Sequence, residues 1–140
     1  MVKLLIIADD FTGALDTGIQ FVNKGIATQV FTKMPEAIGD IDETTEVLVI
    51  DSETRPMPAA KAYDTVKNIT GWAKAIKIPI IFKKTDSALR GNIGITVRNA
   101  AHFMMPDICW RARESRSVKN AEVSSSRTWY YMRKVLTMRL

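Results

Sequence analysis

An apolar run near the N-terminus ends abruptly in two carboxylates, and this junction constrains the fold more than any other feature of the chain. Residues 2–8 are almost all apolar, Asp9 and Asp10 follow them, and a turn rich in small residues comes next. A continuous apolar run is typical of a strand buried on both faces of a parallel sheet. Ligands bind outside the carboxyl ends of such strands, so Asp9 and Asp10 are expected at a binding site.

The same junction also has a purely structural interpretation, as the cap of a helix. Asp10 or Thr12 could accept hydrogen bonds from the first backbone N–H groups of a following helix. Capping accounts for one carboxylate and not for two, so the binding-site interpretation stays open beside it. Successive side chains of an extended backbone alternate in direction, so if the backbone is still extended at this point, Asp9 is expected to point away from Asp10 and to serve the fold more than the substrate.

Strand and helix patterns alternate over the first hundred residues. Apolar runs predict strands at residues 2–8, 27–31, 47–50 and 78–82, and helical spacing predicts helices at residues 13–24, 58–75 and from about residue 94. In the first helix, Leu15, Ile19 and Phe21 or Val22 are expected to face the sheet. The repeated order of strand and helix predicts an α/β domain with a doubly wound, mainly parallel sheet.

Polar clusters follow three of the predicted strands, at residues 9–10, 51–55 and 83–90. The carboxyl ends of parallel strands share one edge of the sheet, so these clusters are expected to face a common cleft. Arg binds a carboxylate through two hydrogen bonds, Lys adds a point charge, and Asp can orient a hydroxyl or accept its proton. Each cluster alone could be a solvated turn, but together they suit a small anionic, hydroxylated substrate.

Three stretches together resemble the N-terminal domain of the four-carbon acid sugar kinase family, in its threonate and erythronate kinase branch. They are residues 7–14 (IADDFTGA), 51–55 (DSETR) and 83–94 (KKTDSALRGNIG), in the order and approximate spacing of the family. The resemblance covers about residues 1–102. It implies a two-domain enzyme that phosphorylates a four-carbon sugar acid, with the acid bound by the N-terminal domain and ATP with Mg²⁺ bound by a C-terminal domain.

The resemblance also implies roles for individual residues. Asp10 would act as the base that orients the substrate hydroxyl, and further residues would bind the substrate. This substrate-binding set comprises Asp10, Arg55, Lys83, Lys84, Thr85, Asp86 and Arg90. The chain has no phosphate loop of the form Gly-x-x-x-x-Gly-Lys-Ser/Thr, so it is expected to bind neither ATP nor a metal alone and to be inactive as a kinase by itself.

The net charge of +5 belongs to the C-terminal part of the chain. Residues 1–107 hold 12 Lys and Arg against 13 Asp and Glu, whereas residues 108–140 hold 8 against 2. The family pattern and the alternation of strand and helix both stop near Phe103. We therefore expect an incomplete α/β domain at residues 1–103 and an irregular basic tail at residues 104–140, of the kind that a frameshifted or truncated gene would encode.

Two other functions remain open. A non-catalytic protein could bind nucleic acid through the arginines and aromatic residues of the tail, although no nucleic-acid-binding module is recognisable there. The aromatic residues are Trp110, Trp129, Tyr130 and Tyr131. A phosphotransferase of the haloacid dehalogenase type would need a second acid two residues after its nucleophile, and Thr12 stands at that position after Asp10.

Cellular location is predicted from what the sequence lacks. No apolar stretch approaches the length of a membrane span, no signal-peptide pattern precedes the first strand, and Cys109 is the single cysteine. One cysteine cannot form an internal disulfide, which fits a reducing compartment. We expect a cytoplasmic protein whose partner is a small anionic sugar acid and not a membrane, while the sequence makes no prediction of the oligomeric state.

Overall fold

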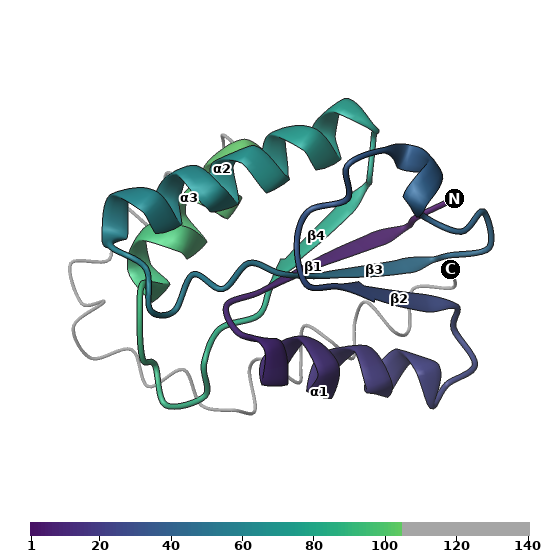
Figure 1. Cartoon of the computed structure of the whole chain (residues 1–140), viewed down its shortest axis with the longest axis horizontal. Coiled ribbons are helices and arrows are strands. Elements are labelled where there is room, and N and C mark those ends of the chain that lie inside the picture. Colours follow the sequence, from purple (N-terminus) through teal and green to yellow (C-terminus); the bar gives the residue numbers. More distant parts are fainter. Residues whose placement is uncertain (105–140) are drawn as a thin grey trace.

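Helices cover both faces of a four-stranded parallel sheet in the computed structural model, which describes the backbone of residues 1–104 and the side chains of residues 1–97 and Ala100 (Figure 1). The strands lie in the order β2-β3-β1-β4. Their bounds are β1 Leu4–Ala8, β2 Thr28–Phe31, β3 Val47–Asp51 and β4 Ile80–Lys83. The helices are α1 Phe11–Val22, η1 (a 3-10 turn) Ile38–Asp40, α2 Ala59–Ala75 and α3 Ile93–Met104. The predicted α/β class with a parallel sheet is confirmed.

Strand β1 lies inside the sheet and is buried along its whole length. Leu5 and Ile7 pack into the core beneath α2 and α3, whereas Leu4, Ile6 and Ala8 pack into the core beneath α1. Both faces of the strand are therefore covered by helices, which is why its sequence is apolar at every position and not at every second one.

The element boundaries differ from the predicted ones by a few residues. Helix α1 begins at Phe11 and not at residue 13, because Asp10 is its N-terminal cap. Strand β4 begins at Ile80 and not at residue 78, because the N–H of Ile78 still donates to the carbonyl of Ala73 at the end of α2, at 2.9 Å. Local hydrogen bonds of this kind set the ends of elements, and apolar spacing does not report them.

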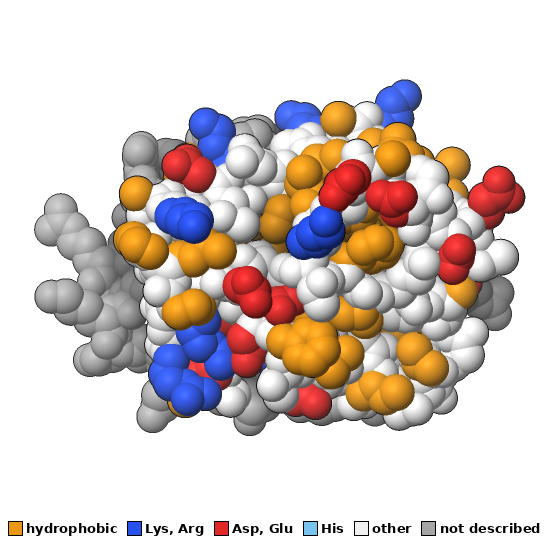
Figure 2. All heavy atoms as spheres, viewed as in Figure 1, with side chains coloured by type: hydrophobic (Ala, Val, Ile, Leu, Met, Phe, Trp, Pro, Cys, Tyr) orange, Lys and Arg blue, Asp and Glu red, His pale blue; other side chains and the backbone are white. Residues whose placement is uncertain are grey.

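The face that α1 turns to the sheet is not the one predicted. Phe21 is buried as expected, but Leu15, Ile19 and Val22 are between 44% and 49% exposed. The residues that α1 buries are mostly small, namely Gly13, Ala14, Thr17, Gly18 and Phe21. The larger apolar side chains instead gather over α1 at the lower side of the molecule (Figure 2).

Close packing of α1 on the sheet explains this orientation. A Cβ atom at Gly18 would lie 3.1 Å from a methyl group of Val30 and 3.6 Å from one of Val49. The sheet presents branched side chains here, so the helix reaches contact distance only through a face of small residues. The expectation for Leu15 and Ile19 was wrong because hydrophobicity does not report how closely a helix approaches the sheet. Of the alternatives Phe21 and Val22, it is Phe21 that faces the sheet.

The part of the chain expected to be a basic tail lies almost entirely outside the described residues, which end at residue 104. This includes the four tail aromatic residues and Cys109. Within the described part, no helix is long and apolar enough to span a bilayer.

Two alanine substitutions on α1 test the orientation of this helix. Phe21→Ala is expected to lower the free energy of unfolding by about 3–5 kcal/mol, because it empties a buried site. Leu15→Ala is expected to change it by no more than about 0.5 kcal/mol, because that side chain is half exposed. Urea unfolding measures both, and equal losses in the two variants would contradict the orientation.

Candidate functional site

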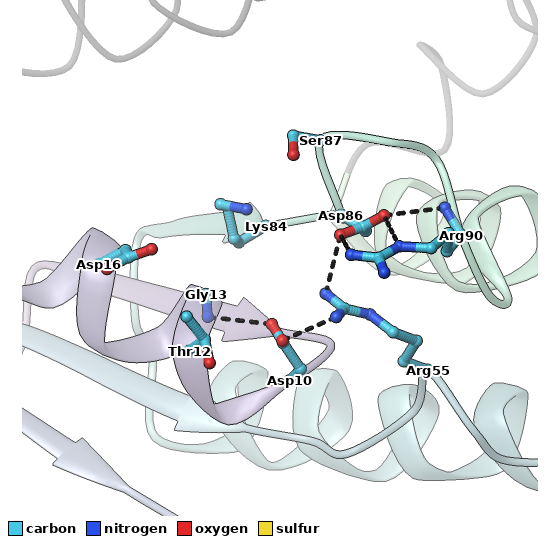
Figure 3. Close-up of a pocket in the computed structure, with 9 residues that line it drawn as sticks. All are labelled: Asp10, Thr12, Gly13, Asp16, Arg55, Lys84, Asp86, Ser87 and Arg90. Carbon is cyan, nitrogen blue, oxygen red and sulfur yellow. Dashed lines mark hydrogen bonds and ion pairs between the residues drawn. The ribbon is translucent and has the colours of Figure 1, made fainter.

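The loops after β1, β3 and β4 leave the sheet at one edge, on the left in Figure 1, and their side chains surround a pocket of about 340 Å³. The lining residues are Asp10, Thr12, Gly13, Asp16, Arg55, Lys84, Asp86, Ser87 and Arg90 (Figure 3). All three polar clusters contribute to this lining. The predicted convergence of the clusters on one cleft is confirmed.

Arg55 lies at the centre of the site, between carboxylates from two other loops (Figure 3). Its Nη1 is 2.8 Å from Oδ2 of Asp10, its Nη2 is 3.2 Å from Oδ1 of Asp86, and its Nε is 3.3 Å from Oδ2 of Asp9. The Arg55 side chain is only 23% exposed, so water screens these ion pairs weakly. One guanidinium therefore connects the loops that follow β1 and β4 to the loop that follows β3.

Hydrogen bonds to backbone carbonyls also hold the same three loops together. The N–H of Arg55 donates to the carbonyl of Asp9 at 3.1 Å. The side-chain amide of Asn92 donates to the carbonyls of Thr54 and Met57, at 2.8 and 2.6 Å. Gly91 has a φ of +82°, and a Cβ atom there would lie 2.9 Å from the carbonyl oxygen of Arg55, so both conformation and space require glycine at this position.

Asp10 has a structural contact and a site contact at the same time. Its Oδ1 accepts a hydrogen bond from the N–H of Gly13 at 2.9 Å, which confirms the helix-cap interpretation, and its Oδ2 pairs with Arg55. Gly13 makes room for this carboxylate, because a Cβ atom there would lie 2.7 Å from Oδ1. Each carboxylate oxygen has a second lone pair, so Asp10 can still accept a hydrogen bond from a ligand hydroxyl.

Asp9 does not point away from Asp10 as the alternation of an extended strand predicts. Its carboxylate contacts the same guanidinium, that of Arg55, from the buried side. The condition for alternation is not met, because the strand ends at Ala8 and Asp9 is no longer held by strand geometry. Asp9 is buried and does not line the pocket, so its described contacts are with the fold.

Asp86 is held between two arginines. Arg90 donates to it from Nε at 2.8 Å, from Nη2 at 3.0 Å and from its backbone N–H at 3.1 Å. The hydrogen bonds from Arg90, helped by the charge of Arg55, hold the pKa of the Asp86 carboxyl well below its usual range. Asp86 therefore stays ionised, and its charge balances that of the arginines.

The neighbouring lysines of the third cluster lie in different environments. Lys83 is partly buried, and its Nζ donates to the carbonyls of Ile7 and Lys84 at 3.2 and 3.0 Å. Burial lowers the pKa of Lys83 to about 8. Lys84 lines the pocket, and its Nζ donates to the carbonyl of Thr85 at 2.7 Å.

The pocket lining therefore overlaps the predicted substrate-binding set without matching it. Asp10, Arg55, Lys84, Asp86 and Arg90 line the pocket, whereas Lys83 and Thr85 do not. Thr12, Gly13, Asp16 and Ser87 line it without having been predicted to do so. Asp16 could have been predicted from helical spacing. It follows Thr12 by four residues, so the two side chains lie on the same face of α1.

A layer of polar groups under the pocket joins β1 to β3. The hydroxyl of Ser52 donates to the carbonyl of Ala8 and also lies 3.1 Å from the hydroxyl of Thr54. Asp51 is buried, and burial raises the pKa of its carboxyl, while the N–H of Glu53 donates to it at 3.0 Å. These residues support the loop that carries Arg55.

Comparison with known families decides what this chain is related to. Residues 4–112 match the model of a family described as "Sugar-binding N-terminal domain". The chain belongs to this family. The domain is that of the four-carbon acid sugar kinases, so the resemblance seen in the sequence is confirmed.

Curated relatives of the chain are kinases of four-carbon sugar acids. A D-threonate kinase of Salmonella typhimurium is 42% identical over 99 residues, which cover 70% of this chain and 23% of that protein. A D-erythronate kinase of Heliobacterium modesticaldum is 31% identical over 107 residues, which cover 76% of this chain and 24% of that protein. The chain thus spans about a quarter of the length of these relatives.

A solved structure shares the fold. It is a protein of Bordetella bronchiseptica with bound citrate, crystallised as a domain-swapped dimer. It superposes with a TM-score of 0.68 at 34% identity, over 72% of this chain and 26% of that one. The two chains therefore share their fold over this part of the sequence.

The buried lysine gives the protein a testable pH dependence. The pKa of Lys83 lies at about 8 in the folded chain, below its ordinary value of 10.5, so the unfolded chain binds more protons between these two pH values. The free energy of unfolding is therefore expected to gain a contribution as pH rises from about 8 to 10.5. Lys83→Met is expected to lose this contribution, as urea unfolding at pH 7.5, 9 and 10.5 would measure.

Lys67→Met is the matched control, because Lys67 is an exposed lysine on α2. It is expected to keep the wild-type pH dependence. If Lys83→Met also keeps it, Lys83 is not a buried ammonium.

Proposed function

We propose that this chain binds the sugar acid substrate of a four-carbon acid sugar kinase of the threonate and erythronate type. The observation that carries the proposal is the pocket itself, in which carboxylates and cations from three loops meet at the carboxyl edge of the sheet. A polyhydroxylated acid needs both kinds of partner, acceptors for its hydroxyl groups and a cation for its carboxylate. The Bordetella relative was crystallised with bound citrate, a hydroxylated anion with three carboxylates, which supports a hydroxylated anion as the ligand but not a particular number of charges.

Asp10 is the residue that we assign to the substrate hydroxyl. It lies in the pocket lining, and its position is fixed from two sides by Gly13 and Arg55. A carboxylate held in this way can orient a hydroxyl for attack and accept its proton. Asp16, on the same helix, offers further acceptor oxygens at the pocket wall.

The described residues do not form a recognisable site for Mg²⁺ or for the phosphates of ATP. The side chains that the structure describes, those of residues 1–97 and Ala100, include no cluster of three His, Cys, Asp or Glu residues that could hold a metal ion. The sequence also has no Gly-x-x-x-x-Gly-Lys-Ser/Thr phosphate loop. Phosphoryl transfer depends on a donor phosphate and Mg²⁺ held in line with the attacking hydroxyl. We therefore assign substrate binding, and not phosphoryl transfer, to the described part of this chain. We also propose that the reaction of the family, which consumes ATP, takes place in the cytoplasm.

The family membership favours this function over the two alternatives. Arg55 contacts Asp9 and Asp10 and so uses the acids that a dehalogenase-type nucleophile would need free. Nucleic-acid binding would depend on tail residues outside the described part of the chain.

Direct titration tests the proposal. Calorimetry of the purified chain with D-threonate and with D-erythronate is expected to show weak saturable binding of at least one of them. Asp10→Asn is expected to weaken this binding about tenfold or more, because it removes the charge that orients the hydroxyl, while Asn still caps the helix. Asp64→Asn, an exposed residue on α2, is the control and should bind as the wild type does. If neither acid binds, the proposal is wrong.

A second assay tests whether the chain binds the sugar acid without transferring a phosphoryl group to it. The chain incubated with ATP, Mg²⁺ and D-threonate is expected to release no sugar acid phosphate above the rate without protein. Turnover at ordinary enzyme rates, of about 1 per second or faster, would show that the chain contains an ATP site of its own.

A further inference from the structure

The cations around the pocket differ in whether a carboxylate already neutralises them. Arg55 pairs with Asp9, Asp10 and Asp86, and Arg90 pairs with Asp86. Lys84 has no ion pair within residues 1–97, and its Nζ has a carbonyl oxygen as its partner. Among the described side chains that line the pocket, Lys84 is thus the cation without a carboxylate.

We infer that Lys84 is the residue that binds the carboxylate of the sugar acid, and that Arg55 and Arg90 position the site without binding it. This inference rests on the proposed function and assigns the charge recognition within it. A ligand carboxylate at Arg55 would have to displace one of three carboxylates that belong to the protein, whereas at Lys84 it meets a charge that has no such partner.

The position of Lys84 supports this division. Its Nζ would lie 3.6 Å from a Cβ atom built on Gly13, so the ammonium lies over the first turn of α1. The carboxylate of Asp10 caps this turn and accepts from the N–H of Gly13, so Lys84 lies beside the end of α1 at which Asp10 is fixed. A ligand carboxylate on Lys84 would therefore place the hydroxyl end of a short ligand near Asp10.

The pairing of charges in the lining indicates the class of ligand. The lining holds three carboxylates, Asp10, Asp16 and Asp86, and three cations, Arg55, Lys84 and Arg90. Arg55 and Arg90 are paired with protein carboxylates, so a ligand with one negative charge can pair with Lys84. A second negative charge would lie against the carboxylates of Asp10 and Asp16. The pocket is thus suited to a hydroxylated monocarboxylate, in preference to a neutral polyol or to a dicarboxylate of the same length.

A series of three ligands tests this inference. D-threitol, D-threonate and tartrate share a hydroxylated four-carbon chain and carry no, one and two negative charges. Calorimetry with the wild-type chain is expected to show D-threonate binding at least about tenfold more tightly than D-threitol and more tightly than tartrate. Lys84→Met is expected to reduce D-threonate binding to the level of D-threitol and to leave D-threitol binding within about twofold of wild type.

Matched variants separate charge recognition from folding. Lys84→Arg should restore the preference for D-threonate, and Lys67→Met, which removes one positive charge from an exposed site on α2, should keep it. Retention of the preference in Lys84→Met, or its loss in Lys67→Met, would overturn the assignment while the proposed function stands. A wild-type chain that binds neither D-threonate nor D-erythronate would instead refute the proposed function together with this inference.

Discussion

One guanidinium, that of Arg55, holds the site together through three carboxylates. The ion pairs join residues that lie 31 or more positions apart in the sequence, and they span the loops of three different strands. Removing a charged group from water costs free energy unless the group is paired. Arg55 and the three carboxylates that it contacts are all paired in this way. Removing Arg55 would leave carboxylates close together without their shared cation, so the geometry of the pocket depends on this residue more than on any other.

The sheet makes this interaction possible. Because the strands are parallel, β1, β3 and β4 end at the same edge and release their loops side by side. The glycine at position 91 and the amide of Asn92 then bring the third loop against the backbone that carries Arg55. Burial of apolar strands thus places the loops, and specific polar contacts fix the distances between them.

The sequence was sufficient to predict the α/β class, the parallel sheet and the meeting of three polar clusters, because apolar runs and polar strand ends are local features. It did not predict the orientation of α1, since Leu15 and Ile19 look like core residues until the close contact of Gly18 with the sheet is known. It also could not separate Lys83 from Lys84. Adjacent residues of one type differ here only in burial and partners, which depend on strands distant in sequence.

Pairing also explains why residue type alone is a poor guide to ligand contacts. The family resemblance implies that Arg55 is a substrate contact, and in the structure Arg55 does bind carboxylates, but they are those of the protein. We therefore propose that Arg55 holds the site together and that Lys84 binds the charge of the ligand. This division of roles is the central proposal.

A crystal structure of the chain with bound D-threonate tests that claim most directly. We expect the ligand carboxylate within hydrogen-bond distance of Nζ of Lys84, a ligand hydroxyl at Asp10, and Arg55 still paired with Asp9, Asp10 and Asp86. A ligand carboxylate bound to Arg55, with any of those three ion pairs broken, would contradict it.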